Sequence, residues 1–174
     1  MKADPGGTDV ADGPANRGQR ARKGAPRAAA SPVPRISPWL LRWFRWYSAR
    51  YLRRHFHALR LSRQCRPDVP EDEPLIVYLN HAAWWDPLVG LVLAERLFPR
   101  RATYAPIEAQ ALGRYRFMER LGLFGIDPQT RSGGLRFLRV SRAILARPDT
   151  ALWITPEGRF ADPRERPVPF RPGL

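Results

Sequence analysis

Apolar and polar positions change in regular blocks along the chain from residue 75 onward. Four short apolar runs have the length and composition of strands: 75–79, 102–106, 122–126 and 150–154. Three longer stretches between them have the length of helices: 87–97, 108–120 and 133–146. Because strands and helices alternate in this way, the pattern predicts an α/β domain over residues 67–174.

A second pattern, with helical period, covers residues 39–61. Apolar side chains are predicted on one face: Leu40, Trp43, Phe44, Tyr47, Tyr51 and Ala58. Arginines are predicted on the opposite face: Arg42, Arg45, Arg50, Arg53 and Arg60. Ser37-Pro38 has the composition of a helix start, with serine as the cap. We therefore predict an amphipathic helix within residues 38–66 that lies in a lipid headgroup layer. The alternative is an ordinary helix packed on its own domain.

Positive charge is concentrated in the N-terminal third. Of a net charge of +14, residues 38–66 contribute eight arginines and no acidic residue, while residues 67–174 are almost balanced. Residues 1–37 are rich in Pro, Gly, Ala and Arg, and we expect a disordered basic tail there. This distribution suits an anionic membrane surface, whereas nucleic acid is a weaker alternative because no base-reading motif accompanies the arginines.

Several classes of protein and site are excluded by composition. The single cysteine, Cys65, excludes an internal disulfide. The first 37 residues contain no apolar run of a signal peptide, and no uncharged apolar stretch of spanning length occurs. The three histidines and one cysteine are not at the spacings of metal ligands, and no glycine-rich phosphate loop is present. We therefore expect no metal and no bound cofactor.

Candidate chemistry begins at the end of the first predicted strand, where His81 is followed five positions later by Asp86. A turn between strand and helix would bring the two side chains together, with Asp86 as helix cap before Pro87. The carboxylate could then fix the imidazole tautomer, while the other ring nitrogen removes a proton from a hydroxyl. The alternative is a plain helix cap beside a hydrogen-bonded histidine.

A second candidate motif, Pro156-Glu157-Gly158-Arg159, follows the last predicted strand. Gly158 allows a sharp turn beside a ligand, Glu157 could bind an acceptor hydroxyl or hold the loop, and Arg159 could bind a phosphate. The alternative is a Pro-Gly turn whose charged side chains face water.

Together, Asn80-His81-x-x-x-x-Asp86 and Pro156-Glu157-Gly158-Arg159 resemble the first and third motifs of the glycerolipid acyltransferases, which act on lysophospholipids and glycerol 3-phosphate. The resemblance covers residues 75–174 and implies a mixed sheet flanked by helices. It implies His81 as general base, Asp86 as its partner, and Glu157 and Gly158 at the substrate site. It further implies transfer from a thioester, with acyl-CoA or acyl-carrier protein as co-substrate and with neither a metal nor a covalent intermediate.

The chain departs from the family pattern at three places. Arg159 stands where the family has threonine, and Pro128 stands where the middle motif has an arginine. Arg131 follows three residues later and becomes the candidate for that position, which leaves room for a glycolipid or another hydroxylated acceptor. The sequence also ends at Leu174, where the family continues, so a C-terminal truncation is expected.

The resulting expectation is a peripheral O-acyltransferase at the cytoplasmic face of the cell membrane. It would transfer a fatty acyl group to a hydroxyl of a lysophospholipid, glycolipid or similar lipid. Its partners would be a lipid acceptor, an acyl thioester donor and an anionic membrane surface, with no nucleic acid. The alternative is a catalytically inactive, truncated membrane-binding protein.

Overall fold

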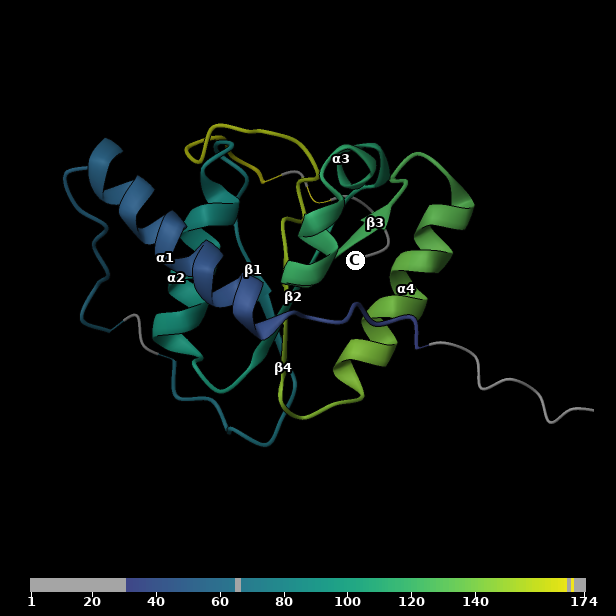
Figure 1. The fold of residues 1–174 in the computed structure, drawn as a ribbon. Coiled ribbons are helices and arrows are strands. Elements are labelled where there is room, and N and C mark those ends of the chain that lie inside the picture. The colour runs from purple at the N-terminus through teal and green to yellow at the C-terminus, as the bar shows by residue number, and fades with distance from the viewer. Residues whose placement is uncertain (1–30, 65–66, 169, 171–174) are drawn as a thin grey trace, which may run out of the picture. The chain divides into compact units, whose positions relative to one another are not determined.

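The computed structural model describes residues 31–64, 67–168 and 170, and the tail before residue 31 lies outside them. The part after residue 30 contains helices and strands in the order shown in Figure 1. The helices are α1 (Pro38–His55), α2 (Asp86–Leu97), α3 (Ala109–Arg114), the 3₁₀ helix η1 (Arg116–Leu121) and α4 (Arg131–Leu145). The strands are β1 (Leu75–Tyr78), β2 (Ala102–Glu108), β3 (Leu123–Ile126) and β4 (Thr150–Ile154).

The four strands form one sheet in the order β1-β4-β2-β3. All three pairings are parallel, so the α/β class is confirmed but the sheet is parallel where a mixed one was expected. Parallel strands need crossover connections: α2 connects β1 to β2, α3 and η1 connect β2 to β3, and α4 connects β3 to β4. Because every strand runs the same way, all four carboxyl ends lie at one edge of the sheet. Loops from distant parts of the sequence therefore meet there.

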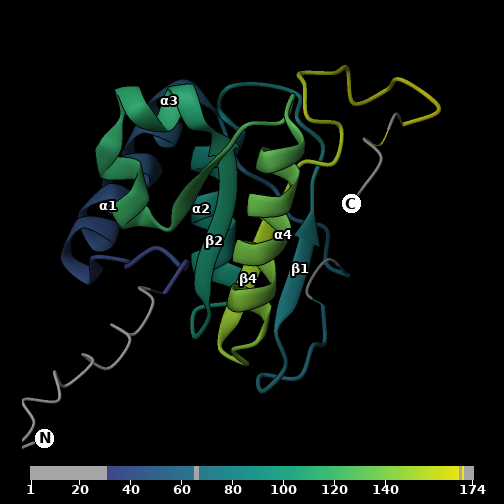
Figure 2. The ribbon, with the colours of Figure 1, turned by 90° about the vertical axis from the view of Figure 1, so that its right-hand side faces the viewer.

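Both faces of the sheet are covered, which explains why β4 is buried at every position. Successive side chains of a strand point to opposite faces, so β4 contributes to two cores. Ala151 and Trp153 pack with α2, whereas Leu152 and Ile154 pack with α4. Figures 1 and 2 show the sheet between these two helices. The central strand thereby fixes the position of the loop that follows it.

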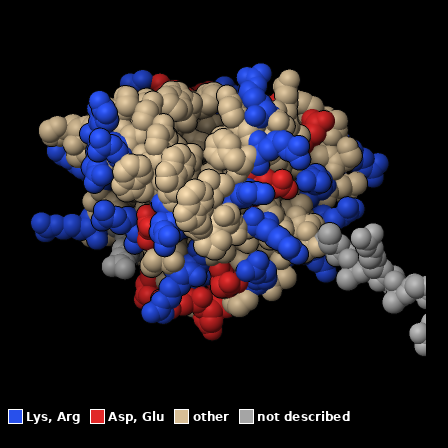
Figure 3. Space-filling view, viewed as in Figure 1, with Lys and Arg blue, Asp and Glu red and all other residues tan. Residues whose placement is uncertain are grey.

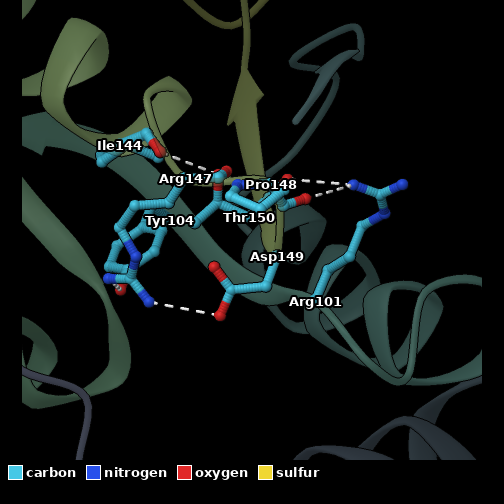
Figure 4. A network of polar contacts seen from close by, with 7 residues as sticks. All are labelled: Arg101, Tyr104, Ile144, Arg147, Pro148, Asp149 and Thr150. Carbon is cyan, nitrogen blue, oxygen red and sulfur yellow. Dashed lines mark hydrogen bonds and ion pairs between the residues drawn. The ribbon is translucent and has the colours of Figure 1, made fainter. Parts of the chain in front are cut away.

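A buried arginine secures the edge of the sheet opposite to these carboxyl ends. Arg101 is 6% exposed, and its guanidinium donates hydrogen bonds to the backbone carbonyls of Glu73, Pro70 and Pro148. Nearby, the Thr150 hydroxyl donates to the carbonyls of Ile144 and Arg147, as part of the network in Figure 4. A buried guanidinium is tolerated because several carbonyls satisfy its donors. The network joins the starts of β2 and β4 to the end of α4.

The segment before α1 differs from the expected disordered tail. Val33 is 9% exposed and packs in the core beside α4, and Ser37 N donates to Arg120 O at 2.9 Å. The expectation of disorder is therefore wrong for residues 33–37, because one apolar side chain and a backbone hydrogen bond attach the segment to the domain. Residues 1–30 of the same predicted tail lie outside the described residues.

Helix α1 begins as predicted and ends earlier. Ser37 is its cap residue and Pro38 its first residue. The predicted helical pattern continues to residue 61, but the chain becomes extended at Phe56, so Ala58 and Arg60 are outside the helix. The Phe56 ring meets the Trp85 ring edge-on, with centroids 5.1 Å apart. This tertiary contact accompanies the extended backbone, whereas the continuing helical period alone gave no sign of the end.

The faces of α1 also differ from the prediction. The buried residues are Ser48 and Leu52, and Trp39, Trp43, Trp46 and Tyr47 are exposed. Arg45, expected on the outer polar face, lies with its guanidinium 3.9 Å from the carboxylate of Glu95 on α2. Helix α1 therefore packs on α2 through a narrow stripe and exposes tryptophans together with arginines. No helix in the described ranges combines the length and apolarity needed to cross a bilayer.

Candidate active site

Two loops at the carboxyl edge of the sheet meet because their strands are neighbours. Tyr78, the last residue of β1, is in register with Ile154, the last residue of β4. His81 and Glu157 each follow three residues after these positions, so the register alone brings them to the same place. The backbone hydrogen bond from Leu79 N to Ile154 O, 3.0 Å long, extends the pairing toward the loops.

The side chains of His81 and Asp86 are in direct contact. His81 Nδ1 lies 2.9 Å from Asp86 Oδ2, and Ala83 N donates to the same oxygen at 3.0 Å. The turn between β1 and α2 therefore folds back on itself around one carboxylate. Only about a quarter of the His81 side chain and a fifth of the Asp86 side chain is exposed, at 25% and 21%. Partial shielding from water strengthens such a contact and still leaves access to a substrate.

The predicted role of Asp86 as helix cap is wrong. Trp85 occupies the cap position, Asp86 is the first residue of α2, and Pro87 follows it. The Asp86 carboxylate bonds backward, to the turn that carries His81, rather than forward to the helix. Because the carboxylate occupies Nδ1, it favours the tautomer that carries the hydrogen on Nδ1 and leaves Nε2 able to accept a proton.

The Glu157 side chain forms a hydrogen bond with the backbone of this turn. Its side chain is buried, at 5% exposed, and Oε2 accepts a hydrogen bond of 2.9 Å from His81 N. Ala161 N donates to His81 O at 2.9 Å, so both backbone polar groups of His81 bond to the loop after β4. Of the two roles considered for Glu157, this contact is that of holding the loop. A buried carboxylate with a backbone donor is well suited to that task.

The remaining predicted residues lie around this centre at different distances. Gly158 has a left-handed backbone with φ of 60°, which allows the sharp turn after Glu157. Arg159 contacts an exposed residue of the same loop, with its Nη2 at 3.4 Å from Glu165 Oε1. Further along this loop, hydrogen bonds from Arg164 hold the pKa of the exposed Asp162 below its usual range. The loop after Glu157 is thus supported by its own ion pairs.

Arg131 is not brought next to His81. It is the exposed first residue of α4 and follows β3, which β4 and β2 separate from β1. Three strand spacings correspond to roughly 14 Å. Neighbouring residues line a cavity of about 520 Å³ whose polar members include Arg116, Arg136, Thr130 and Ser132. Arg131 therefore lies at the same edge of the sheet as His81, but too far away for direct contact.

Aromatic residues surround the turn at residues 81–86, and the sequence analysis did not predict most of their contacts. The Phe160 ring lies 4.3 Å from the His81 ring, between centroids. On the other side, Trp85 contacts Tyr51 at 5.3 Å and Trp84 at 3.9 Å. The position of Phe160 directly after the second motif was the available signal. The contacts of Trp85 with α1 had none, because they join segments far apart in the sequence.

An apolar cavity of about 540 Å³ lies between the C-terminal half of α1, the chain that follows it, and α2. Its apolar wall includes Leu52, Phe56, Leu59, Leu61, Val89, Val92, Leu93 and Leu97. Val89 lies about one helical turn from Asp86, so this cavity begins close to the turn at residues 81–86. In the described part of the chain, no cluster of His, Cys, Asp and Glu could hold a metal ion.

Comparison with known families agrees with this geometry. A family model described as Acyltransferase matches residues 60–174, well over half of the chain. The chain belongs to the acyltransferase family. The match contains β1 to β4 and both loops that form the site. The protein is therefore an acyltransferase. Comparisons with curated proteins and with solved structures found no match.

Proposed function

We propose that this acyltransferase moves a fatty acyl group from a thioester to a hydroxyl of a lipid at a membrane surface. The observation that carries the proposal is the contact of 2.9 Å between His81 Nδ1 and Asp86 Oδ2, in a turn that Glu157 holds by its buried carboxylate. A histidine oriented in this way can act as the general base that activates a hydroxyl as nucleophile.

The proposed reaction proceeds by direct attack. His81 Nε2 accepts the proton of the acceptor hydroxyl while the hydroxyl oxygen bonds to the thioester carbonyl carbon. The carbon–sulfur bond then breaks, the thiolate leaves, and the protonated His81 returns its proton to the sulfur. Asp86 stabilises the imidazolium that forms between these steps. The products are an ester and a free thiol, so no oxidant, metal or enzyme-bound acyl group is required.

A lipid acceptor is favoured by the surroundings of the site. The apolar cavity beside α2 begins one turn from Asp86, and its volume of about 540 Å³ is in the range of sites for sizeable ligands. The exposed tryptophans and arginines of α1 have the composition of a surface that lies among lipid headgroups. The proposed location is therefore peripheral, at the cytoplasmic face of the cell membrane.

The acceptor's polar group is the second part of the proposal. Arg159 is about half exposed, with only an exposed partner at 3.4 Å, so it is free to turn toward an acceptor phosphate or sugar. Arg131 stands at the same sheet edge, near the cavity beside β3, and would contact only a large headgroup. The proposed acceptors are accordingly a lysophospholipid, as in phospholipid biosynthesis, or a glycolipid. Acyl-CoA and acyl-carrier protein are the two donors to compare.

The experiment is transfer of a labelled acyl group by the full-length protein. Labelled acyl-CoA or acyl-carrier protein is mixed with vesicles that contain one acceptor at a time, including a lysophospholipid and a glycolipid. We expect a labelled lipid ester with at least one pair of donor and acceptor. Vesicle-bound, folded protein that forms no labelled ester with any pair would contradict the proposed function.

A further inference from the structure

We propose that Trp84, within the turn that carries His81 and Asp86, contacts the lipid bilayer as part of one surface shared with α1. We call this surface the aromatic band: Trp43, Tyr47, Tyr51, Trp85 and Trp84. The inference rests on the proposed function and adds the part of the molecule that would present the catalytic base to the membrane. Sequence reasoning placed lipid contact on the helix alone.

The aromatic band is continuous through ring contacts. Trp43 stacks on Tyr47 with centroids 5.7 Å apart, and Tyr47 stacks on Tyr51 at 5.8 Å. These residues are four positions apart on α1, which places their side chains one above another on the helix surface. Tyr51 contacts Trp85 at 5.3 Å, and Trp85 stacks on Trp84 at 3.9 Å. The band therefore leads from the outer surface of α1 to the turn at residues 81–86, which we call the catalytic turn.

Both ends of the aromatic band are open to solvent. Trp43 is 48% exposed and Trp84 is 56% exposed. Trp39, 68% exposed, precedes the N-terminal end of the band, and Trp46, 59% exposed, adds ring surface elsewhere on α1. In Figure 3, uncharged side chains form a broad group on the face where α1 lies, with a hollow beside it. So much exposed ring surface is unusual for a surface that faces only water, and it indicates a binding partner.

A bilayer is the partner that this surface fits. Tryptophan and tyrosine favour the headgroup level, because their rings are apolar and their N–H or O–H groups still meet water. Exposed arginines on α1 stand beside the rings and could bind lipid phosphates: Arg42, Arg50, Arg53 and Arg54. The helix carries no acidic residue that would repel those phosphates. Charge and ring type thus agree on an anionic lipid surface.

Contact through Trp84 would fix the depth of the chemistry. Trp84 lies three residues after His81, in a turn held by the bonds from Ala83 N to Asp86 and from His81 N to Glu157. Because the turn is tied at both sites, a ring placed at headgroup level would keep the imidazole near the same level. The acceptor hydroxyl should therefore lie on the glycerol or headgroup part of a lipid.

The test is binding of the full chain to vesicles of phosphatidylcholine and phosphatidylglycerol, measured by co-sedimentation without any acyl donor. Trp84→Ala should weaken partitioning about tenfold, the effect of losing roughly one large side chain from the interface. Trp84→Phe should retain most of the binding. The matched control is Leu138→Ala, which removes an apolar side chain with 55% exposure from α4 on the other face of the sheet. It should bind like the parent protein.

Equal binding of the parent, Trp84→Ala and Leu138→Ala proteins would overturn the inference. As a second measurement, lipids brominated near the headgroup should quench less tryptophan emission in Trp84→Phe than in the parent, and unchanged quenching would also count against it. Circular dichroism checks that each variant is folded. Because binding is measured without turnover, a protein that needs Trp84 for binding but transfers no acyl group contradicts the proposed function alone.

Discussion

At the scale of single residues, the site depends on how few groups hold the catalytic turn. Asp86 Oδ2 is hydrogen-bonded to His81 Nδ1 and accepts a hydrogen bond from Ala83 N, and Glu157 accepts one from His81 N. The sequence predicted that residues 81 and 86 meet, because a turn between strand and helix can bring the two side chains together. It could not assign the backbone contact of Glu157, because that contact depends on the register of two strands 76 positions apart.

Glu157 provides the first prediction. Glu157→Ala leaves the His81 N–H without its partner at a partly buried position, which should lower the free energy of unfolding by about 1–3 kcal/mol. Glu157→Gln keeps an oxygen acceptor and should cost less. Urea unfolding measures both, and Glu108→Gln is the control because that residue is exposed at the end of β2. If both Glu157 variants unfold like the parent protein, the loop-holding role is wrong.

At the scale of elements, local sequence determined most of the structure. The strands and the helices at 86–97 and 131–145 lie within a few residues of their predicted bounds. The predicted helix at 108–120 is instead α3 followed by η1, with a break at Tyr115. Apolar period does not reveal such breaks, nor does it show which side of α1 is buried. The buried side of α1 packs on α2, where Arg45 lies beside Glu95 and Phe56 contacts Trp85.

A glycine at the join between η1 and β3 provides the second prediction. Gly122 has φ of +101°, and a side-chain carbon there would lie 2.3 Å from Thr103 O. Gly122→Ala should therefore destabilise the fold by at least about 1–3 kcal/mol. Gly134→Ala is the matched control, because it meets nothing within 4 Å in α4 and should stabilise the protein by roughly 1 kcal/mol. Thermal unfolding separates the two, and a stable Gly122→Ala protein would show that this turn is not strained.

At the scale of the whole domain, the two edges of the sheet have different tasks. Arg101 and Thr150 secure the amino ends of the central strands, and the carboxyl ends carry the catalytic turn beside the aromatic band. Separating the two allows the site to be open without weakening the core. The sequence indicated a basic, aromatic helix next to an α/β domain. It could not show that the aromatic surface of the helix continues into the catalytic turn, since that continuity arises from packing.

Membrane binding provides the third prediction. The full protein should bind anionic vesicles with an affinity that falls steeply as salt rises from low to physiological concentration, because exposed arginines of α1 are screened within about 8–10 Å. Vesicle co-sedimentation over a salt series measures this. Equal binding to neutral vesicles at high salt would remove the electrostatic part of the account.

The most direct test of the central claim is acyl transfer by His81→Ala, compared with the parent protein under conditions where the parent forms a labelled ester. We predict a loss of about 10²–10⁴-fold in turnover with unchanged folding, because the variant lacks the base that removes the hydroxyl proton. Asp86→Asn should lower turnover as well, while Asp72→Asn, the same change at an exposed carboxylate before β1, should not. Unchanged turnover in a folded His81→Ala protein would contradict the account.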